Sequence, residues 1–200
     1  TLRSEGGYSS IATTSGTGAE TTQMSISSAG FTSLDANTMA TEAGTGITGG
    51  TGTIYRSSVI REGGIIKTSI LIDLTGLRST ASGDIIGVDG TSNVCHIGQI
   101  TAARNGTILA GRMTCFEAPA GGDPDINVHS ATESTGVEDG AISDLTETLL
   151  LNNGDSTLGK VGIFEAVPAA DEFLYLTLGA TTDADYTAGK LLIELFGYEA

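Results

Sequence analysis

Residues 63–77, GGIIKTSILIDLTGL, alternate apolar and polar side chains with a period of two. The even positions carry Ile66, Thr68, Ile70, Ile72 and Leu74, and the odd positions include Lys67, Ser69 and Asp73. A period of two places one set of side chains on a single face of an extended strand. The stretch therefore predicts a strand with one buried face, preceded across a turn at Glu62-Gly63-Gly64 by a second extended run at 55–61.

Further extended runs follow the first two along the chain, with turn residues between them. They lie at 84–88, 94–103, 107–117, 125–131, 159–167, 172–178 and 190–199. The segment 141–151 fits either a short helix or a strand, and the run 190–199 is apolar on both faces, so it is either central in a sheet or covered by a partner. Many short strands without βαβ alternation predict an all-β fold, either an antiparallel β-sandwich or a jelly-roll-like barrel with an extended N-terminal arm.

The dipeptide Asn105-Gly106 lies between two of these runs and predicts a tight hairpin. A two-residue turn would place Cys95 opposite Phe116, so that the two cysteine side chains point to opposite faces of the sheet. A three-residue loop would instead place Cys95 opposite Cys115. We expect two free, buried thiols, because free cysteine behaves as a small core residue.

The first 52 residues differ in composition from the rest. Residues 1–52 consist mostly of Thr, Ser, Gly and Ala, too few apolar side chains for a core of their own. We therefore expect an extended arm at 1–52 and a β-sandwich or barrel domain at 53–200. Another protein chain would hold the arm, although it could instead fold back on its own domain. The expected partner contacts are the large apolar residues Tyr8, Ile11, Met24, Phe31 and Leu34.

The charge balance excludes several classes of partner. The chain has 9 Lys and Arg against 24 Asp and Glu, a formal net charge of -15, so neither a nucleic-acid backbone nor an anionic membrane surface is an expected partner. Only 16% of residues are charged, so much of the surface is Thr, Ser, Gly and Ala, which suits burial against protein. No apolar run reaches the length of a membrane helix, and the start, TLRSEGGYSS, lacks the features of a signal peptide.

Candidate chemistry is sparse. His96 and His129 have no second ligand at metal-binding spacing, so no metal site and no cofactor are expected. Aspartates in the segments 121–127 and 183–185 fit turn chemistry, with a bound calcium ion as the alternative. No nucleophile motif and no phosphate-binding loop is present. We therefore expect no catalytic residues and no enzyme activity.

Several ordered segments resemble one family. They are SSVIREGGIIKTSILIDLTGL, DIIG, HIGQITAARNGTILAGRMTCFEAPAGGDPDINVHSATESTGV, VPAADEFLYLTLG and YTAGKLLIELFGYEA. Together they resemble capsid decoration (cement) proteins of marine tailed bacteriophages that infect cyanobacteria and pelagic alphaproteobacteria. The resemblance covers residues 53–200 and leaves the arm uncovered.

The resemblance implies a structural virion protein that binds and stabilises the outside of a phage capsid. Its expected partners are the major capsid protein and other copies of itself, in a homotrimer assembled in the host cytoplasm. The family has no catalytic residues to carry over. The alternative is a module of the tail or of a capsid projection that binds host surface glycans through the loops 79–92 and 119–140.

Overall fold

The alternating stretch forms the strand that its pattern predicts. In the computed structural model, β6 (Ile65–Asp73) buries its even positions and leaves most of its odd positions half-exposed. It pairs antiparallel with β5 (Ile54–Glu62) across a turn at Gly63 and Gly64, whose φ angles of 59° and 85° are readily adopted by glycine. The prediction of a half-buried strand behind a glycine turn is confirmed.

The structure describes the backbone of residues 2–5, 8–14, 20–27, 30–34 and 42–199, with side chains from Glu42 onward except that of Ser79. It forms two compact units, Thr1–Ala40 and Thr41–Ala200. The first unit is an antiparallel sheet of four strands in sequence order, β1 (Leu2–Glu5), β2 (Tyr8–Thr14), β3 (Glu20–Ser27) and β4 (Gly30–Leu34). The segment expected as an arm thus has strands that pair with one another.

Residues 42–52 belong to the second unit, so the boundary lies nearer the N-terminus than the expected residue 52. Ile47, in the short helix α1 (Thr45–Thr48), is fully buried in the main core. The amide of Gly44 donates to the carbonyl of His96 at 2.8 Å, and that of Gly46 donates to Val94 at 2.9 Å. Core packing and hydrogen bonds therefore hold this segment on the body.

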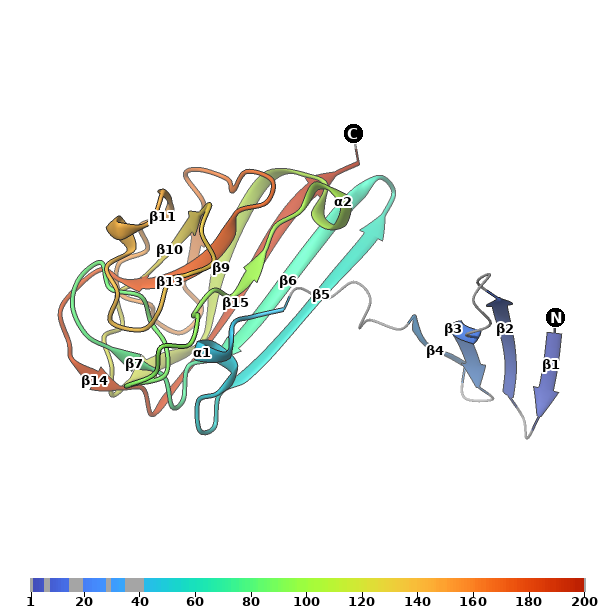
Figure 1. Cartoon of the computed structure of the whole chain (residues 1–200), viewed down its shortest axis with the longest axis horizontal. Helices are drawn as coiled ribbons and strands as arrows, with labels where there is room; N and C mark the ends of the chain where they lie inside the picture. Colours follow the sequence, from blue (N-terminus) through green and yellow to red (C-terminus); the bar gives the residue numbers. More distant parts are fainter. Residues whose placement is uncertain (1, 6–7, 15–19, 28–29, 35–41, 200) are drawn as a thin grey trace. The chain divides into compact units, whose positions relative to one another are not determined.

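The larger sheet of the body has five strands in the order β12-β9-β15-β6-β5. The three not yet introduced are β9 (Thr107–Ala120), β12 (Val161–Ile163) and β15 (Ala188–Tyr198). Figure 1 shows β9, β15, β6 and β5 running side by side. The run 190–199 is therefore a central strand, which accounts for apolar residues on both of its faces.

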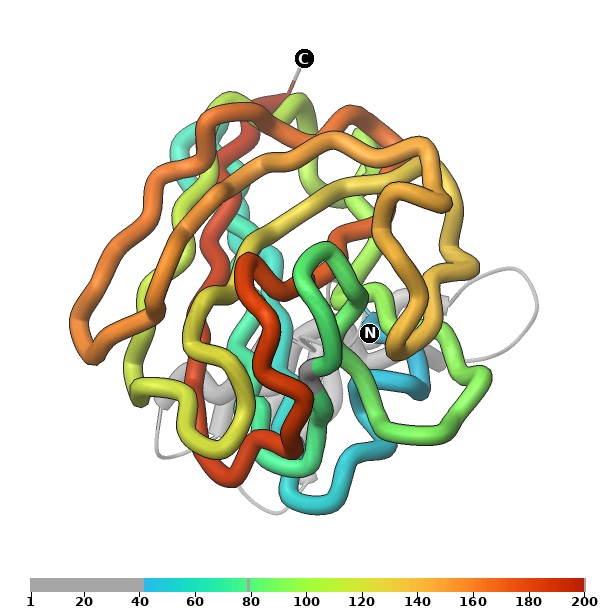
Figure 2. Tube along the Cα trace, turned by 90° about the vertical axis from the view of Figure 1, so that its left-hand side faces the viewer, coloured from blue at the N-terminus to red at the C-terminus, as the bar shows by residue number. Residues whose placement is uncertain are grey.

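The second sheet has four strands in the order β11-β10-β13-β8. Their bounds are β8 (Gly98–Gln99), β10 (Ile126–Ala131), β11 (Glu147–Leu151) and β13 (Phe173–Leu178). The ambiguous segment 141–151 contains both a short 3-10 helix, Ile142–Asp144, and β11. A small third sheet pairs β7 (Arg78–Ser79) with β14 (Ala184–Asp185), and Figure 2 shows the red segment around β14 beside the green one around β7.

The core lies between the two larger sheets. The five-stranded sheet supplies Ile70, Ile72 and Ile193, and the four-stranded sheet supplies Val128 and Leu176, all fully buried in one cluster. Because every strand pairing is antiparallel and the two sheets share this cluster, the body is an all-β sandwich, as the sequence predicts.

The predicted hairpin at Asn105-Gly106 is wrong. The helix α2 (Ala102–Asn105) ends there, and Gly106, with φ 69°, leads into β9. The buried Asn105 side chain accepts a hydrogen bond from the Thr101 amide at 2.9 Å and donates one to Thr68 Oγ1 at 2.7 Å. These bonds end a helix instead of turning a hairpin, so β8 pairs with β13 while β9 pairs with β15 and β12.

The two cysteines are free and buried, as expected. Cys95 lies in the core beside α1, and Cys115 faces the same core from β9. Burial raises the pKa of the Cys95 thiol to about 12, so it stays protonated at neutral pH. Both α-helices have four residues, and within the described part of the chain no helix could cross a membrane.

Candidate functional site

The five residues expected to contact a partner lie in the N-terminal sheet. Tyr8 and Ile11 are in β2, Met24 is in β3, and Phe31 and Leu34 are in β4, but their side chains lie outside the described part of the structure. The backbone register pairs Ile11 with Met24 and Met24 with Leu34. Three of the five are thus neighbours in one cross-strand row, and their contacts with a partner stay a prediction.

The side of the five-stranded sheet that faces away from the core is an open surface of the described body. Strand pairing aligns its residues in five rows, which we call the outer sheet face. Read from β5 across to β9 and β12, the rows are Ile54-Asp73-Lys190-Glu117, Arg56-Leu71-Leu192-Thr114-Val161, Ser58-Ser69-Glu194-Arg112-Ile163, Ile60-Lys67-Phe196-Ala110 and Glu62-Ile65-Tyr198-Thr107.

The two sheets of the sandwich differ in how they are covered. Every residue of β10 is buried, and so is every residue of β13 after the half-buried Phe173. In β5, by contrast, only Val59 is buried, and in β12 both Val161 and Ile163 are exposed. Apart from Glu147, Thr148 and Leu149 on the edge strand β11, the sheet surface that stays accessible among the described strands of these two sheets lies on the outer sheet face.

Large apolar side chains are exposed across this face from one edge strand to the other. They are Ile54, Ile60, Ile65, Val161, Ile163 and Tyr198, with exposed fractions from 38% to 64%. Single scattered exposed apolar residues are ordinary on a soluble protein, whereas several that gather on one face are typical of an interaction surface. The sequence holds this signal in the alternate positions of its strands, but the rows appear only once strand order and register are known.

A buried carboxylate lies at the centre of the outer sheet face. Glu194 on β15 is only 3% exposed and accepts hydrogen bonds from Nε and Nη2 of Arg112, both at 2.6 Å. Lys67 on β6 forms an ion pair with its other oxygen at 2.5 Å. Burial alone would raise the pKa of Glu194, but the bonds from Lys67 and Arg112 outweigh burial, and the pKa lies below its ordinary value.

A second ionic cluster lies at one end of the same face. Lys190 pairs with Asp73 at 3.2 Å and with Glu117, and these bonds raise the Lys190 pKa, with that to Glu117 contributing most. Asp73 also accepts from the Thr75 hydroxyl at 2.7 Å. The charges of the two clusters are therefore paired within the sheet.

The charges in the five rows balance. The basic members are Arg56, Lys67, Arg112 and Lys190, and the acidic members are Glu62, Asp73, Glu117 and Glu194. Four of the nine basic residues of the chain thus lie on this face against four of its 24 acidic ones. The face is neutral, and the excess of negative charge lies elsewhere in the chain.

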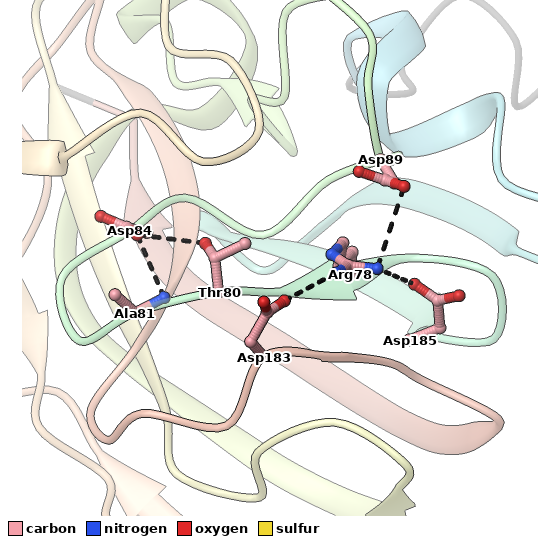
Figure 3. A network of polar contacts seen from close by, with 7 residues as sticks. All are labelled: Arg78, Thr80, Ala81, Asp84, Asp89, Asp183 and Asp185. Carbon is pink, nitrogen blue, oxygen red and sulfur yellow. Dashed lines mark hydrogen bonds and ion pairs between the residues drawn. The ribbon is translucent and has the colours of Figure 1, made fainter.

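The two aspartates of the acidic segment 183–185 form ion pairs with Arg78. The guanidinium of Arg78 lies 2.8 Å from Asp183 and 3.1 Å from Asp185, and Asp89 is 3.8 Å away (Figure 3). In the same view, the Asp84 carboxylate accepts from the Ala81 amide at 3.0 Å, which closes the neighbouring turn. Arg78 thereby joins β7, β14 and the loop at Asp89, and the aspartates act as its partners.

The other acidic segment, 121–127, contains a side-chain turn. Asp123 accepts a hydrogen bond from the Asp125 amide at 2.9 Å, in agreement with the turn interpretation. The Lys160 ammonium donates to the carbonyl of Asp155 at 2.8 Å and to that of Asn153. Burial, followed by repulsion from Asp123 and Asp155, raises the pKa of Asp125. Among the described residues, no group of three His, Cys, Asp or Glu is arranged to hold a metal ion.

The histidines occupy different surroundings. His129 Nδ1 lies 2.7 Å from Glu147 Oε2, a contact between β10 and β11 that spacing along the sequence does not reveal. The His96 ring packs against Phe173 with centroids 5.1 Å apart, and burial lowers its pKa. Neither arrangement places a nucleophile beside a base, so neither provides the geometry that covalent catalysis requires.

Two shallow hollows flank α2. One, of about 370 Å³, is lined by Arg61, Thr107 and Glu199 among others, and the ion pair between Arg61 and Glu199 crosses it. The other, of about 320 Å³, is lined mainly by aliphatic residues that include Ile108 and Val167. Neither brings together the convergent polar groups that orient a small ligand.

Comparison of the chain with models of known families, with curated proteins and with solved structures finds no match.

Proposed function

We propose that this protein is a structural component of a tailed-phage virion, which binds the outside of the capsid and stabilises it. The observation that carries the proposal is the outer sheet face, a neutral surface with exposed apolar side chains that suits contact between the protein subunits of an assembly. The resemblance of residues 53–200 to capsid decoration proteins supports the same function. The proposed partners are the major capsid protein and other copies of this chain, in a homotrimer.

The division of the chain into two units supports separate roles for them. The body keeps its own core and includes residues 42–52, while Thr1–Ala40 forms a separate small sheet. We assign the contact with neighbouring shell subunits to this N-terminal unit. Two contacts on one chain raise avidity, since the second contact forms at a high effective concentration.

Co-sedimentation tests this function. Expanded, empty capsids of the phage that encodes the chain are mixed with the full chain and with a variant that lacks residues 1–40. We expect the full chain to pellet with the capsids and the truncated body, still folded by circular dichroism, to remain in the supernatant. A full chain that stays in the supernatant would contradict the function. A truncated body that still pellets would contradict the role of the N-terminal unit alone.

A glycan array addresses the rival function of host recognition by the loops 79–92 and 119–140. We expect no saccharide to bind. A saturable signal that disappears when Asp89, in the loop 79–92, is changed to Asn would favour glycan binding over capsid binding.

A further inference from the structure

We propose that the outer sheet face is the contact surface between copies of this chain, so that a second copy covers it. This inference rests on the proposed function and names the partner of that surface. It is independent of the N-terminal unit, to which the contact with the shell is assigned.

The distribution of charge over the chain favours a second copy as the partner that covers the outer sheet face. With four basic and four acidic residues in the rows, the rest of the chain has five basic residues against twenty acidic ones. Two copies that met through the remaining surface would bring like charges together, which is unfavourable. The outer sheet face lets such an acidic protein approach another copy without this repulsion.

The two ionic clusters on the face do not oppose its burial, while Arg56 and Glu62, which are exposed on the edge strand β5 and have no ion pair among the described residues, lie at the rim of the contact. Glu194 is already 3% exposed in the single chain, so covering it removes little further water. Its partners Lys67 and Arg112 hold it from two neighbouring strands, and Arg112 also lies over the Phe196 ring, 5.8 Å from its centroid. Charges that are paired within one copy need no matching charge from the other.

The size of the face fits a stable contact. Strands about 4.8 Å apart, with about 3.4 Å per residue, give the five rows an area of about 600 Å². Two surfaces of that size bury about 1,200 Å² in total, the lower bound for specific interfaces. The exposed isoleucines on β5, β6 and β12 supply apolar contact at both edges.

Sedimentation of the full chain tests the inference. At tens of micromolar we expect a species that is a multiple of the 20.2 kDa chain. The variant Ile60→Lys/Ile163→Lys changes two side chains that are 55% and 64% exposed on opposite edge strands of the face. Because an unpaired charge in an apolar contact is unfavourable, we expect its dissociation constant for self-association to rise at least about tenfold.

Leu158→Lys is the matched control. Leu158 is 74% exposed, more than either isoleucine, and lies outside the five rows. We expect it to associate as the natural chain does, and we expect all variants to have the same thermal unfolding midpoint at a concentration at which each is monomeric. A natural chain that sediments as a monomer would overturn the inference. So would an oligomer that Ile60→Lys/Ile163→Lys leaves intact, or one that Leu158→Lys weakens equally.

Capsid co-sedimentation separates this inference from the proposed function. If the full chain binds capsids but is monomeric, the inference fails and the function stands. If it self-associates through the face but binds no capsid, the function fails and the contact between copies stands. If Ile60→Lys/Ile163→Lys abolishes capsid binding while self-association persists, the outer sheet face binds the shell protein. That result also overturns the inference.

Discussion

At the scale of single residues, Glu194 is the side chain on which the outer sheet face depends most. It is a buried acid held by Arg112 and Lys67 from the two neighbouring strands. For Glu194→Gln we expect the free energy of unfolding, measured in urea, to fall by about 1–3 kcal/mol, since charged hydrogen bonds are replaced by weaker ones. The exposed Glu165→Gln serves as the control and should change it by less than about 0.5 kcal/mol.

The lowered pKa of Glu194 gives a pH dependence of known sign. A carboxyl whose pKa is lower in the folded protein stabilises it above the unfolded pKa, which is about 4.3 for glutamate. That contribution is lost as the pH falls through the folded pKa. We therefore expect Glu194→Gln to flatten the loss of stability below about pH 4.3, measured by urea unfolding at several pH values. An unchanged acid slope would contradict the ion-pair network.

The sequence shows that Glu194 interrupts an apolar run, but it does not show what holds it. Its partners are on strands from distant parts of the chain, and the pairing of β15 with both β6 and β9 brings them together. The same limit applies to His129 and Glu147 and to Arg78 and Asp185. Ion pairs of this kind depend on strand order, which a period-two pattern does not determine.

At the scale of elements, Gly106 is a position where backbone geometry restricts the choice of residue. Its φ is 69°, and a Cβ there would lie 2.3 Å from the Tyr198 carbonyl oxygen, which belongs to a neighbouring strand. We expect Gly106→Ala to lower the free energy of unfolding by about 3 kcal/mol or more, because a clash adds to the cost of placing alanine at φ 69° and ψ -161°, a backbone region that essentially only glycine adopts.

Gly63→Ala is the control in which an added Cβ meets no other atom. Gly63 has a φ of 59° in the turn between β5 and β6, and a Cβ added there would meet no atom within 4 Å. Its substitution should cost only the conformational penalty, about 1–2 kcal/mol. Equal losses in the two variants, measured by urea denaturation, would show that the approach of Tyr198 has no energetic weight.

These two glycines also show what the sequence could predict at this scale. Gly63 and Gly64 follow a strand with a clear alternating pattern, so the hairpin of β5 and β6 could be predicted. Asn105-Gly106 carries an equally strong turn signal, but the Asn105 side chain bonds Thr101 and Thr68 and ends a helix. Both sites carry a glycine-containing turn signal. They differ because the Asn105 side chain makes a tertiary hydrogen bond to Thr68 on β6.

At the scale of the whole molecule, the position of the boundary between the two units has a measurable consequence. Removal of residues 1–40 should leave the thermal unfolding midpoint of the body unchanged. Removal of residues 1–52 should lower stability by about 2–5 kcal/mol, because it deletes Ile47 from the core. Two truncated chains of equal stability would contradict the placement of α1 within the body.

The all-β class and the β6 strand could be predicted because alternation and turn residues are local properties. Composition also distinguishes the first part of the chain, but it places the change near residue 52, since residues 42–52 are even richer in glycine and threonine than those before them. Ile47 is the one large apolar residue among them, and its burial fixes the segment to the body. One apolar residue in a polar segment does not reveal in the sequence that the segment packs on the body, whereas its burial in the structure does.

The copy number of the chain in purified virions tests the central claim most directly. Quantitative mass spectrometry can compare this chain with the major capsid protein in particles of the phage that, under the proposed function, encodes it. We expect a fixed ratio that corresponds to occupancy of the symmetry axes of the shell, and cryo-electron microscopy should place the protein on the outer surface. Absence from the particles, or only the few copies typical of a tail component, would contradict the account.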